Sequence, residues 1–452
     1  METNPSKMNE KTADLSPTEW FEKFRSISKE ELELSTKPPH SAVLISRDDY
    51  INENEYGKKR KAESDLRMIR MAPLFVSQPR LEKICKDRTN QFLSSCFTEY
   101  SFKSDEDDSV NEFHEKANDL EYLINLCGSN LTYLNVKEYP TSQIMPIINA
   151  NCSNLENLYS RFKEIMSQDF ENCFSNMSQL KDLTIEWQCE NSTLPMTLAK
   201  SLEQIAGTLK RLDFLCILEE NKIFLPDPLA SVLPRLTALN RLEIRSFGLS
   251  QLLLQSIGEI ENLTYLSLMT SWPNNHPILD TRINMHPIGY LKNLENLCID
   301  CDYGVRDEFL INLCNNAKRL KFLHITGTNI SDFGMSAIDE LKQLEKFNLG
   351  LTCSFRPSRK NEFITDESIQ CLFNQKLIIL NISNCINITD KGVFKVVENL
   401  PNLQFLNIEN TKVTRRAVEK ILKLTEDCPE PLIVYENTQS AVPITSPSSF
   451  FY

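Results

Sequence analysis

The chain has 452 residues and a formal net charge of −13 at pH 7. This acidic balance argues against a general nucleic-acid-binding surface, because phosphate contacts need clustered Lys and Arg. Glycine is scarce, with 11 residues, and no GxGxxG or GxxxxGK sequence is present to form a phosphate-binding loop. The N-terminus lacks the apolar core of a signal peptide, and no apolar run reaches membrane-spanning length. We therefore expect an intracellular protein, cytoplasmic or nuclear, whose 14 cysteines are reduced and mostly buried.

The N-terminal part is polar apart from one helical signal. Residues 1–14 are predicted to be disordered. Ser16 followed by Glu19 is a capping box, Pro17 suits the first helical position, and the apolar residues that follow share one helical face: Trp20, Phe21, Phe24 and Ile27. This amphipathic helix either packs on the body of the protein or docks on a partner. Residues 34–65 lose the periodicity and contain Lys58-Lys59-Arg60-Lys61, which is either a solvated loop or a nuclear-import signal.

One short pattern, L-x-x-L-x-[I/L/V/F], recurs through most of the remaining chain. Its spacing ranges from 24 residues (131 to 155) to 33 residues (344 to 377), and it starts at Leu131, Leu155, Leu180, Leu209, Leu239, Leu263, Leu294, Leu320, Leu344, Leu377 and Leu403. The copy at Leu155 departs from the pattern, with Ser160 at the third apolar position. A unit of this length cannot bury its apolar face alone and needs neighbouring copies stacked on it. The sequence therefore predicts an α/β solenoid of about 11 repeats.

The best-formed copy lies between Leu377 and Leu403. Alternation from Leu380 to Ile382 predicts a short strand, and the spacing of the apolar residues from 393 to 400 predicts a helix. Thr389 and Asp390 are suited to cap the start of that helix, and Pro401 to end it.

Strands are also predicted at both ends of the array. Residues 97–102 form an opening strand pattern and residues 432–435 a closing one, so that the repeat region covers 96–436; residues 437–452 are predicted to be a disordered tail. Insertions at 219–228, 271–287 (with Trp272) and 354–362 are candidate contact loops, although ordinary surface variation also explains them.

The repeats resemble a known family. Cys152-Ser-Asn-Leu155-Glu-Asn-Leu158 and the run from Leu377 to Val393 are similar to the cysteine-containing leucine-rich repeats typical of F-box proteins. The characteristic step after the strand recurs as Ile330-Ser-Asp332, Ile364-Thr-Asp366, Ile388-Thr-Asp390 and, weakened, Val413-Thr414. The resemblance implies a horseshoe-shaped leucine-rich-repeat solenoid.

The same family carries an F-box, a small all-α module that docks on the Skp adaptor of cullin-based ubiquitin ligases. Leu15, Pro17, Glu19, Phe24 and Leu32 resemble its opening, and Ile84-Cys85-Lys86 resembles its later segment. Residues 15–95 are thus similar to a degenerate F-box split by the basic loop at 34–65. The resemblance implies adaptor docking through Pro17, Trp20, Phe21, Phe24, Ile27 and Ile84, with a Skp-family adaptor and a cullin as partners.

No pattern for catalysis or for a cofactor is found. None of the five histidines stands in a recognisable local signature with a nucleophile. Cys298-Ile-Asp-Cys301 lacks the second pair of ligands that a zinc site needs. We expect a non-enzymatic chain without metal or cofactor, and His324, on the outward side of its predicted strand, to be a satisfied or solvent-facing residue.

The period of two along a strand predicts which side chains face the concave surface. Interfaces concentrate binding energy in aromatic and arginine anchors. The candidate partner contacts are therefore Arg241, Arg245, Tyr265, Phe322, His324 and Phe405.

The predicted function follows from the resemblance. It is that of the substrate-recognition subunit of a Skp, cullin and F-box ubiquitin ligase, which binds an unknown target protein on its concave surface. Two alternatives remain: an interaction scaffold or inhibitor without a link to ubiquitination, and an RNA-associated protein that uses the basic region.

Overall fold

The computed structural model describes residues 98–102, 110–139, 142–162, 166–187, 194–217, 223–270, 283–301, 304–349, 359–425 and 431–436. The chain divides into two units, residues 60–437 and the end segments Met1–Lys59 with Thr438–Tyr452, and all described residues belong to the first. The six predicted adaptor-docking residues, the basic loop and both predicted disordered ends lie outside the described residues.

A 13-stranded parallel sheet is the main element of the described unit. Its strands follow one another in chain order: β1 (Glu99–Ser101), β2 (Tyr133–Val136), β3 (Asn157–Phe162), β4 (Asp182–Trp187), β5 (Arg211–Cys216), β6 (Arg241–Arg245), β7 (Tyr265–Met269), β8 (Asn296–Asp300), β9 (Phe322–Ile325), β10 (Lys346–Asn348), β12 (Ile379–Asn381), β14 (Phe405–Asn407) and β15 (Ile433–Tyr435). The prediction of a leucine-rich-repeat solenoid is confirmed, since all eleven predicted copies and both end strands supply one strand each.

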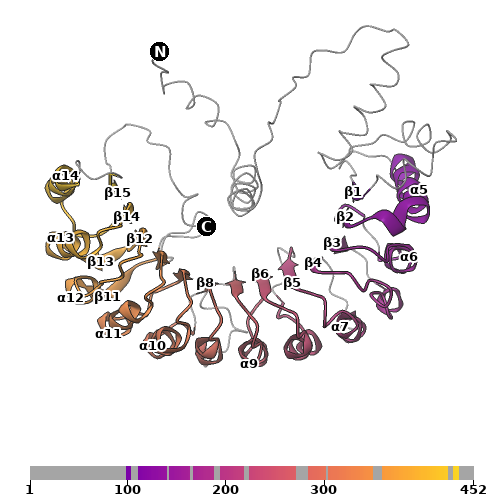
Figure 1. Ribbon diagram of the computed structural model, residues 1–452, viewed down its shortest axis with the longest axis horizontal. Helices are drawn as coiled ribbons and strands as arrows, with labels where there is room; N and C mark the ends of the chain where they lie inside the picture. Colours follow the sequence, from indigo (N-terminus) through magenta and orange to yellow (C-terminus); the bar gives the residue numbers. More distant parts are fainter. Residues whose placement is uncertain are drawn as a thin grey trace, which may run out of the picture. The chain divides into compact units, whose positions relative to one another are not determined.

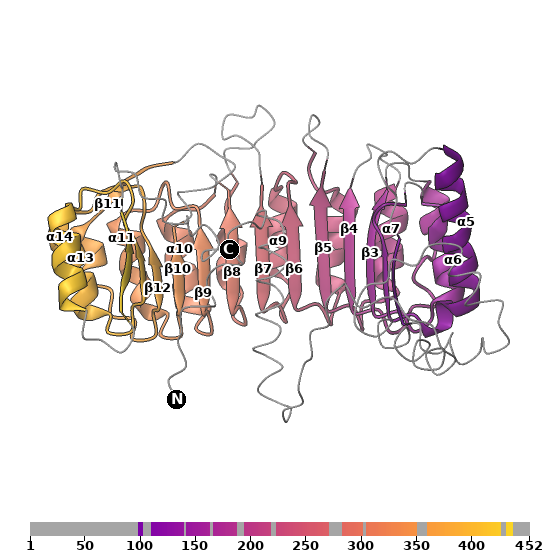
Figure 2. The same cartoon turned by 90° about the horizontal axis from the view of Figure 1, so that it is seen from above.

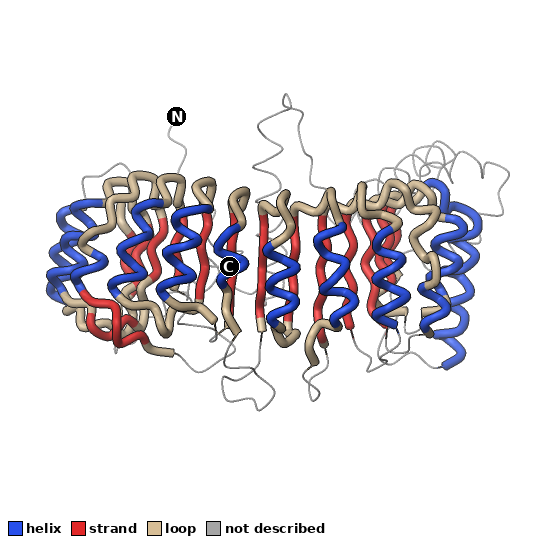
Figure 3. The backbone as a smooth tube through the Cα atoms, turned by 90° about the horizontal axis from the view of Figure 1, so that it is seen from below, coloured by secondary structure: helices blue, strands red, loops and turns tan. Residues whose placement is uncertain are grey.

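The strands line the concave side of this unit and the helical segments cover its convex side (Figure 1). The helices are α5 (Val110–Cys127), α6 (Ile144–Asn151), α7 (Leu194–Glu203), α8 (Asp227–Val232), α9 (Gln251–Gly258), α10 (Asp307–Asn316), α11 (Asp332–Met335), α12 (Asp366–Ile369), α13 (Asp390–Asn399) and α14 (Arg415–Leu424). Short 3₁₀ segments complete this layer: η1 (Gly128–Asn130), η2 (Ser167–Phe170), η3 (Leu233–Arg235), η4 (His286–Tyr290) and η5 (Ser336–Glu340). Figure 2 shows the strands side by side between α5 and α14, and Figure 3 shows the helices lying over them.

The core lies between the sheet and the helical layer. The first leucine of each copy is buried, from Leu131 at 0% exposure to Leu403 at 7%. Strand residues from Leu134 to Leu406 and helix residues such as Leu254 and Val396 join them in one continuous cluster. Because every repeat contributes the same inward leucines, the sequence period is also the period of the core.

A ladder of hydrogen bonds joins the helix starts of the C-terminal repeats, and it explains the recurring Ile-Ser/Thr-Asp step. Ser331, Thr365, Thr389 and Thr414 are the N-caps of α11, α12, α13 and α14. Each of them also donates its backbone N–H and its hydroxyl to the aspartate that opens the helix of the preceding repeat: Ser331 to Asp307, Thr365 to Asp332, Thr389 to Asp366 and Thr414 to Asp390. We call this set the aspartate ladder. The predicted cap at Thr389 is confirmed, and its role extends to the neighbouring repeat.

Two glycines leave room for the ladder. A side-chain carbon at Gly334 would collide with Oδ1 of Asp307, and one at Gly392 would collide with Oδ1 of Asp366. In these two repeats the carboxylate of the previous repeat lies where a side chain would be, whereas the equivalent positions of α12 and α14 hold Ser368 and Ala417. In contrast, an added carbon at Gly207 meets nothing within 4 Å.

Two further strands were not predicted from the sequence. β11 (Asn361–Thr365) pairs with β13 (Cys385–Asn387) in a separate two-stranded parallel sheet. Asn361 is fully buried there and its side-chain amide donates to the backbone oxygens of Gly327 and Ile330. These hydrogen bonds also link the end of the third insertion to the repeats before it.

Candidate functional site

The parallel register arranges the concave side chains in rows that run across the strands. The first row consists of Tyr133, Asn157, Asp182, Arg211, Arg241, Tyr265, Asn296, Phe322, Lys346, Ile379 and Phe405. The second row consists of Asn135, Tyr159, Thr184, Asp213, Glu243, Ser267, Cys298, His324, Asn348, Asn381 and Asn407. A shorter third row contains Arg161, Glu186, Leu215, Arg245, Met269 and Asp300.

Glu243 is the centre of a charge cluster in the middle of this surface. Its Oε1 lies 2.6 Å from Nη2 of Arg241 and 3.5 Å from Nη2 of Arg211, and its Oε2 lies 3.6 Å from Nε of Arg245. Burial alone would raise the pKa of Glu243, but the surrounding arginines outweigh this effect and hold the pKa below its usual range. The carboxylate is thus ionised and fixes three guanidinium groups around itself.

Asp213 extends the cluster to the neighbouring strand. It is 1% exposed, and its Oδ2 lies 2.6 Å from Nη2 of Arg211. Burial would lower the pKa of Arg211, whereas the hydrogen bonds and charge of Asp213 raise it, and the net effect is a raised pKa. Arg211 therefore stays charged between two buried carboxylates.

A second charge cluster lies at the N-terminal end of the surface. Glu186 lies 2.5 Å from Nζ of Lys137 and 2.5 Å from Nε of Arg161. Burial opposes ionisation of Glu186, but the hydrogen bonds and charge of the two cations lower its pKa. Arg161 was missed by the sequence analysis because the copy at Leu155 looked defective; counting two residues on from Tyr159 would have found it.

Aromatic rings accompany both clusters. The guanidinium carbon of Arg241 lies 3.7 Å from the ring centroid of Tyr265. Burial, with a contribution from Glu243, raises the pKa of Tyr265 to about 12, so the phenol stays neutral. At the other end the rings of Tyr133 and Tyr159 are 5.3 Å apart, and Nζ of Lys137 lies 5.6 Å from the centroid of Tyr159.

The structure brings together three of the six predicted contact residues. Arg241, Arg245 and Tyr265 are partly exposed neighbours on β6 and β7. Phe322 and Phe405 are also partly exposed in the first row, but on β9 and β14, away from that group. The six therefore do not form one continuous patch.

Of the two alternatives expected for His324, a satisfied or a solvent-facing residue, the structure excludes the solvent-facing one. His324 is 2% exposed, between Cys298 and Asn348 in the second row. Burial lowers the pKa of His324 to about 4, although the nearby Asp300 opposes the shift. The general reason is that the side chains of adjacent repeats cover the second row, where Asp213, Glu243, Asn381 and Asn407 are also buried.

Asp300, close to His324, belongs to a buried polar group. Oδ1 of Asp300 accepts a hydrogen bond from Oγ1 of Thr326 at 3.2 Å and lies 3.7 Å from Nη1 of Arg359. Arg359 precedes β11 in the chain and lies within the third insertion, so this insertion reaches back to β8. Sequence reasoning gave no signal for this contact, because it joins residues from distant repeats.

The structure places Cys298 half-buried on the concave side and Cys301 in the core. No group of three or more His, Cys, Asp and Glu residues with metal-binding geometry occurs in the part of the chain that the structure describes. Burial raises the pKa of the Cys298 thiol to about 12, which keeps it protonated. Burial of cysteines is confirmed for seven of the nine in the described ranges, Cys298 and Cys371 being the exceptions.

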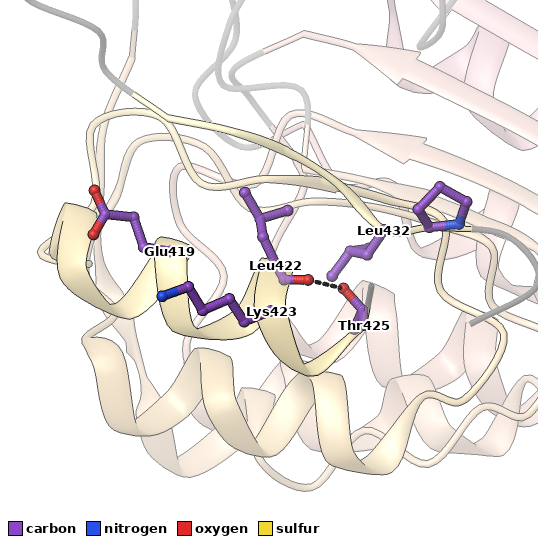
Figure 4. A pocket seen from close by; sticks show the side chains of 6 residues that line it. Glu419, Leu422, Lys423, Thr425 and Leu432 are labelled. Carbon is purple, nitrogen blue, oxygen red and sulfur yellow. Dashed lines mark hydrogen bonds between the residues drawn. The ribbon is translucent and has the colours of Figure 1, made fainter. Parts of the chain in front are cut away.

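An open hollow lies at the C-terminal end of the array, where Leu422 of α14 and Leu432 border it and Glu419 and Lys423 lie on the helix beside it (Figure 4). Oγ1 of Thr425 donates to the backbone oxygen of Leu422 at 3.3 Å. Among the described helices, none is long and apolar enough to cross a membrane.

Comparisons with known proteins identify no family for this chain. No known family model matches the sequence, and no curated protein matches it. Similar solved structures include an internalin of Listeria monocytogenes (18% identity, 86% of this chain and 92% of that chain, TM-score 0.45) and the yeast Rad7 and Elc1 complex (14%, 91% and 97%, 0.40). A leucine-rich-repeat protein of Leptospira interrogans is also similar (17%, 71% and 80%, 0.40). The assignment as a leucine-rich-repeat solenoid rests on the repeats and the 13-stranded sheet of this chain, and its function has to be inferred from its own residues.

Proposed function

We propose that this chain is a non-catalytic protein-binding subunit that holds a target protein on its concave face. The observation that carries the proposal is the array of partly exposed arginines and tyrosines fixed over buried carboxylates on β2 to β7. Arginine and tyrosine are the residues that most often dominate binding energy in protein interfaces. Because ion pairs hold these side chains in place before binding, less conformational entropy is lost when a partner docks.

The finer proposal is that the chain is the substrate-recognition subunit of a Skp, cullin and F-box ubiquitin ligase. Its support is the resemblance of the Ile-Ser/Thr-Asp repeats and of the segments around Pro17 and Ile84 to F-box leucine-rich-repeat proteins. In this role residues 15–95 would hold the adaptor, and the repeats would keep the target near the transfer machinery, raising its effective concentration there. The protein would act in the cytoplasm or the nucleus.

Co-purification from cells of the full-length chain tests the finer proposal. The double variant Trp20→Ala, Phe24→Ala removes two of the predicted adaptor contacts, and Phe450→Ala, Phe451→Ala is the matched control at the other end of the chain. We expect the unaltered chain and the control to recover an adaptor and a cullin, and the Trp20, Phe24 variant to lose both. If the unaltered chain recovers neither, the scaffold or inhibitor alternative replaces the ligase role.

A further inference from the structure

We propose that the concave face over β2 to β7 binds an extended acidic segment of the target protein. This inference rests on the proposed protein-binding function and names the chemistry of its partner. It does not depend on the link to ubiquitination, which the adaptor experiment tests separately.

The charges on this face are arranged with the cations outward. Among the residues that the structure describes, five cations lie on or directly after these strands, Lys137, Arg161, Arg211, Arg241 and Arg245, against four anions, Asp182, Glu186, Asp213 and Glu243, so the balance of these described residues is +1 (five minus four) while the whole chain carries −13. The cationic side chains are 16% to 37% exposed, whereas those of Glu186, Asp213 and Glu243 are 2% to 9% exposed. A docking partner would therefore meet mainly positive charge.

Arg245 has spare capacity for a ligand. Its one described ion pair, to Glu243, spans 3.6 Å; its Nε is buried without a hydrogen bond among the described residues, while the side chain as a whole is 30% exposed. Glu243 already has the closer Arg241 at 2.6 Å. A guanidinium carries five N–H donors in a planar fork suited to carboxylates. The exposed part of the Arg245 side chain can therefore donate hydrogen bonds to an incoming carboxylate without losing a strong bond.

The strand register predicts how far apart two acidic side chains of the bound segment should lie. Arg161 and Arg245 lie in the same third row, three strands apart, with Glu186 and Leu215 between them. At about 4.8 Å between strands this separation is roughly 14 Å, which an extended chain at about 3.3 Å per residue covers in about four residues. Two carboxylates at positions i and i+4 of an extended segment that crosses the strands would therefore reach both arginines.

The aromatic groups favour a peptide over a nucleic acid. Proteins that bind single-stranded nucleic acid without sequence preference rely on exposed aromatic rings on which the bases stack. Here Arg241 lies 3.7 Å from the ring centroid of Tyr265, and Tyr133 and Tyr159 pack against each other at 5.3 Å. The rings thus position the cations and offer little free face for stacking.

Fluorescence anisotropy with the purified full-length chain tests the inference. The probe is a labelled peptide of about nine residues with two glutamates four positions apart, and the same peptide with two glutamines is its control. The variants are Arg161→Gln and Arg245→Gln; Arg235→Gln, on the helical side at η3 and paired only with the exposed Glu203 among described ion pairs, is the matched control.

We expect the glutamate peptide to bind more tightly than the glutamine peptide, and each concave variant to weaken it about fivefold or more, with the effect reduced at high salt. Arg235→Gln should change the affinity less than about twofold. A doubly phosphorylated serine version of the peptide distinguishes phosphate from carboxylate recognition: weaker or equal binding supports a plain acidic segment, and binding of the phosphorylated form alone overturns it.

Equal binding of the glutamate and glutamine peptides would overturn the inference, as would tighter binding of a single-stranded uridine oligonucleotide that is lost with the same two variants. Peptide binding without recovery of the adaptor would leave the inference standing and refute the ligase role. Recovery of the adaptor without peptide binding would do the reverse.

Discussion

The repeats of β2 to β7 and those of β9 to β14 share one hydrophobic core but use their polar side chains in different places. In the N-terminal group, buried carboxylates such as Glu186 and Glu243 hold cations on the concave face. In the C-terminal group the aspartate ladder joins the N-terminal ends of neighbouring helices. The concave second row there is neutral, with the buried residues Asn348, Asn381 and Asn407.

This difference explains why the C-terminal repeats follow a regular sequence motif, whereas the concave residues of the N-terminal repeats do not. The ladder requires Ser or Thr, Asp and in two copies Gly at fixed positions, so the C-terminal repeats keep a recognisable motif. The N-terminal repeats are free of that requirement, and their concave residues vary from strand to strand. The part of the chain that resembles a family most clearly is thus the part whose polar residues are committed to internal structure.

The largest expected effect is loss of a ladder carboxylate. Asp332 accepts hydrogen bonds from the backbone N–H and hydroxyl of Thr365 and from the hydroxyl of Ser368. Asp332→Ala leaves these donors without their acceptor and should cost about 3 kcal/mol locally. Hydrogen exchange in α12 and α13 would then be accelerated about a hundredfold, while β2 to β7 stays unchanged, because repeat stability depends mainly on nearest neighbours.

Asp332→Asn keeps one oxygen acceptor and is the matched control, with a smaller acceleration expected. Acceleration of exchange spread evenly over β2 to β14 would show that the two groups of repeats are one cooperative unit. It would contradict the expected difference between them.

Filling a ladder glycine should have the next largest effect. An added carbon at Gly392 meets Oδ1 of Asp366 and lies 2.7 Å from Cδ1 of Ile369, so Gly392→Ala should destabilise the protein by about 2 kcal/mol. Gly207→Ala has open space and should be neutral or slightly stabilising. The two midpoints of urea unfolding, followed by circular dichroism, provide the measurement; equal midpoints would mean that the ladder tolerates displacement of Asp366.

The smallest expected effect is the pH response of His324. Its folded pKa of about 4 lies below the ordinary value of 6.5, so the stability it contributes is present above pH 6.5 and is lost as the pH falls toward 4. Between pH 7 and pH 5.5 the loss should be about 1.2 kcal/mol. His324→Gln should remove this pH dependence, measured as the change in urea midpoint between the two pH values. An unchanged dependence in the variant would place the titrating group elsewhere.

The strand positions were predictable from the sequence, whereas the contacts of the candidate site were only partly so. Each predicted strand begins two residues after its first leucine, as Tyr265 follows Leu263, because the inward pattern is local to one repeat. Arg241, Arg245 and Tyr265 were found by the same period. Arg161, Arg359 and the exposure of His324 were not, since they depend on side chains from other repeats.

By itself, therefore, the sequence determined that this protein is a solenoid, how many strands its repeats supply to the main sheet and which side chains lie on the concave side. These properties follow from leucine spacing, which acts within about 30 residues. The tertiary structure alone decided which concave side chains are buried as carboxylates and which reach solvent as cations, and that each helix cap is also a bond to the preceding repeat. Those outcomes require the stacking of neighbouring repeats, because burial and ion pairing arise between strands that are distant in sequence.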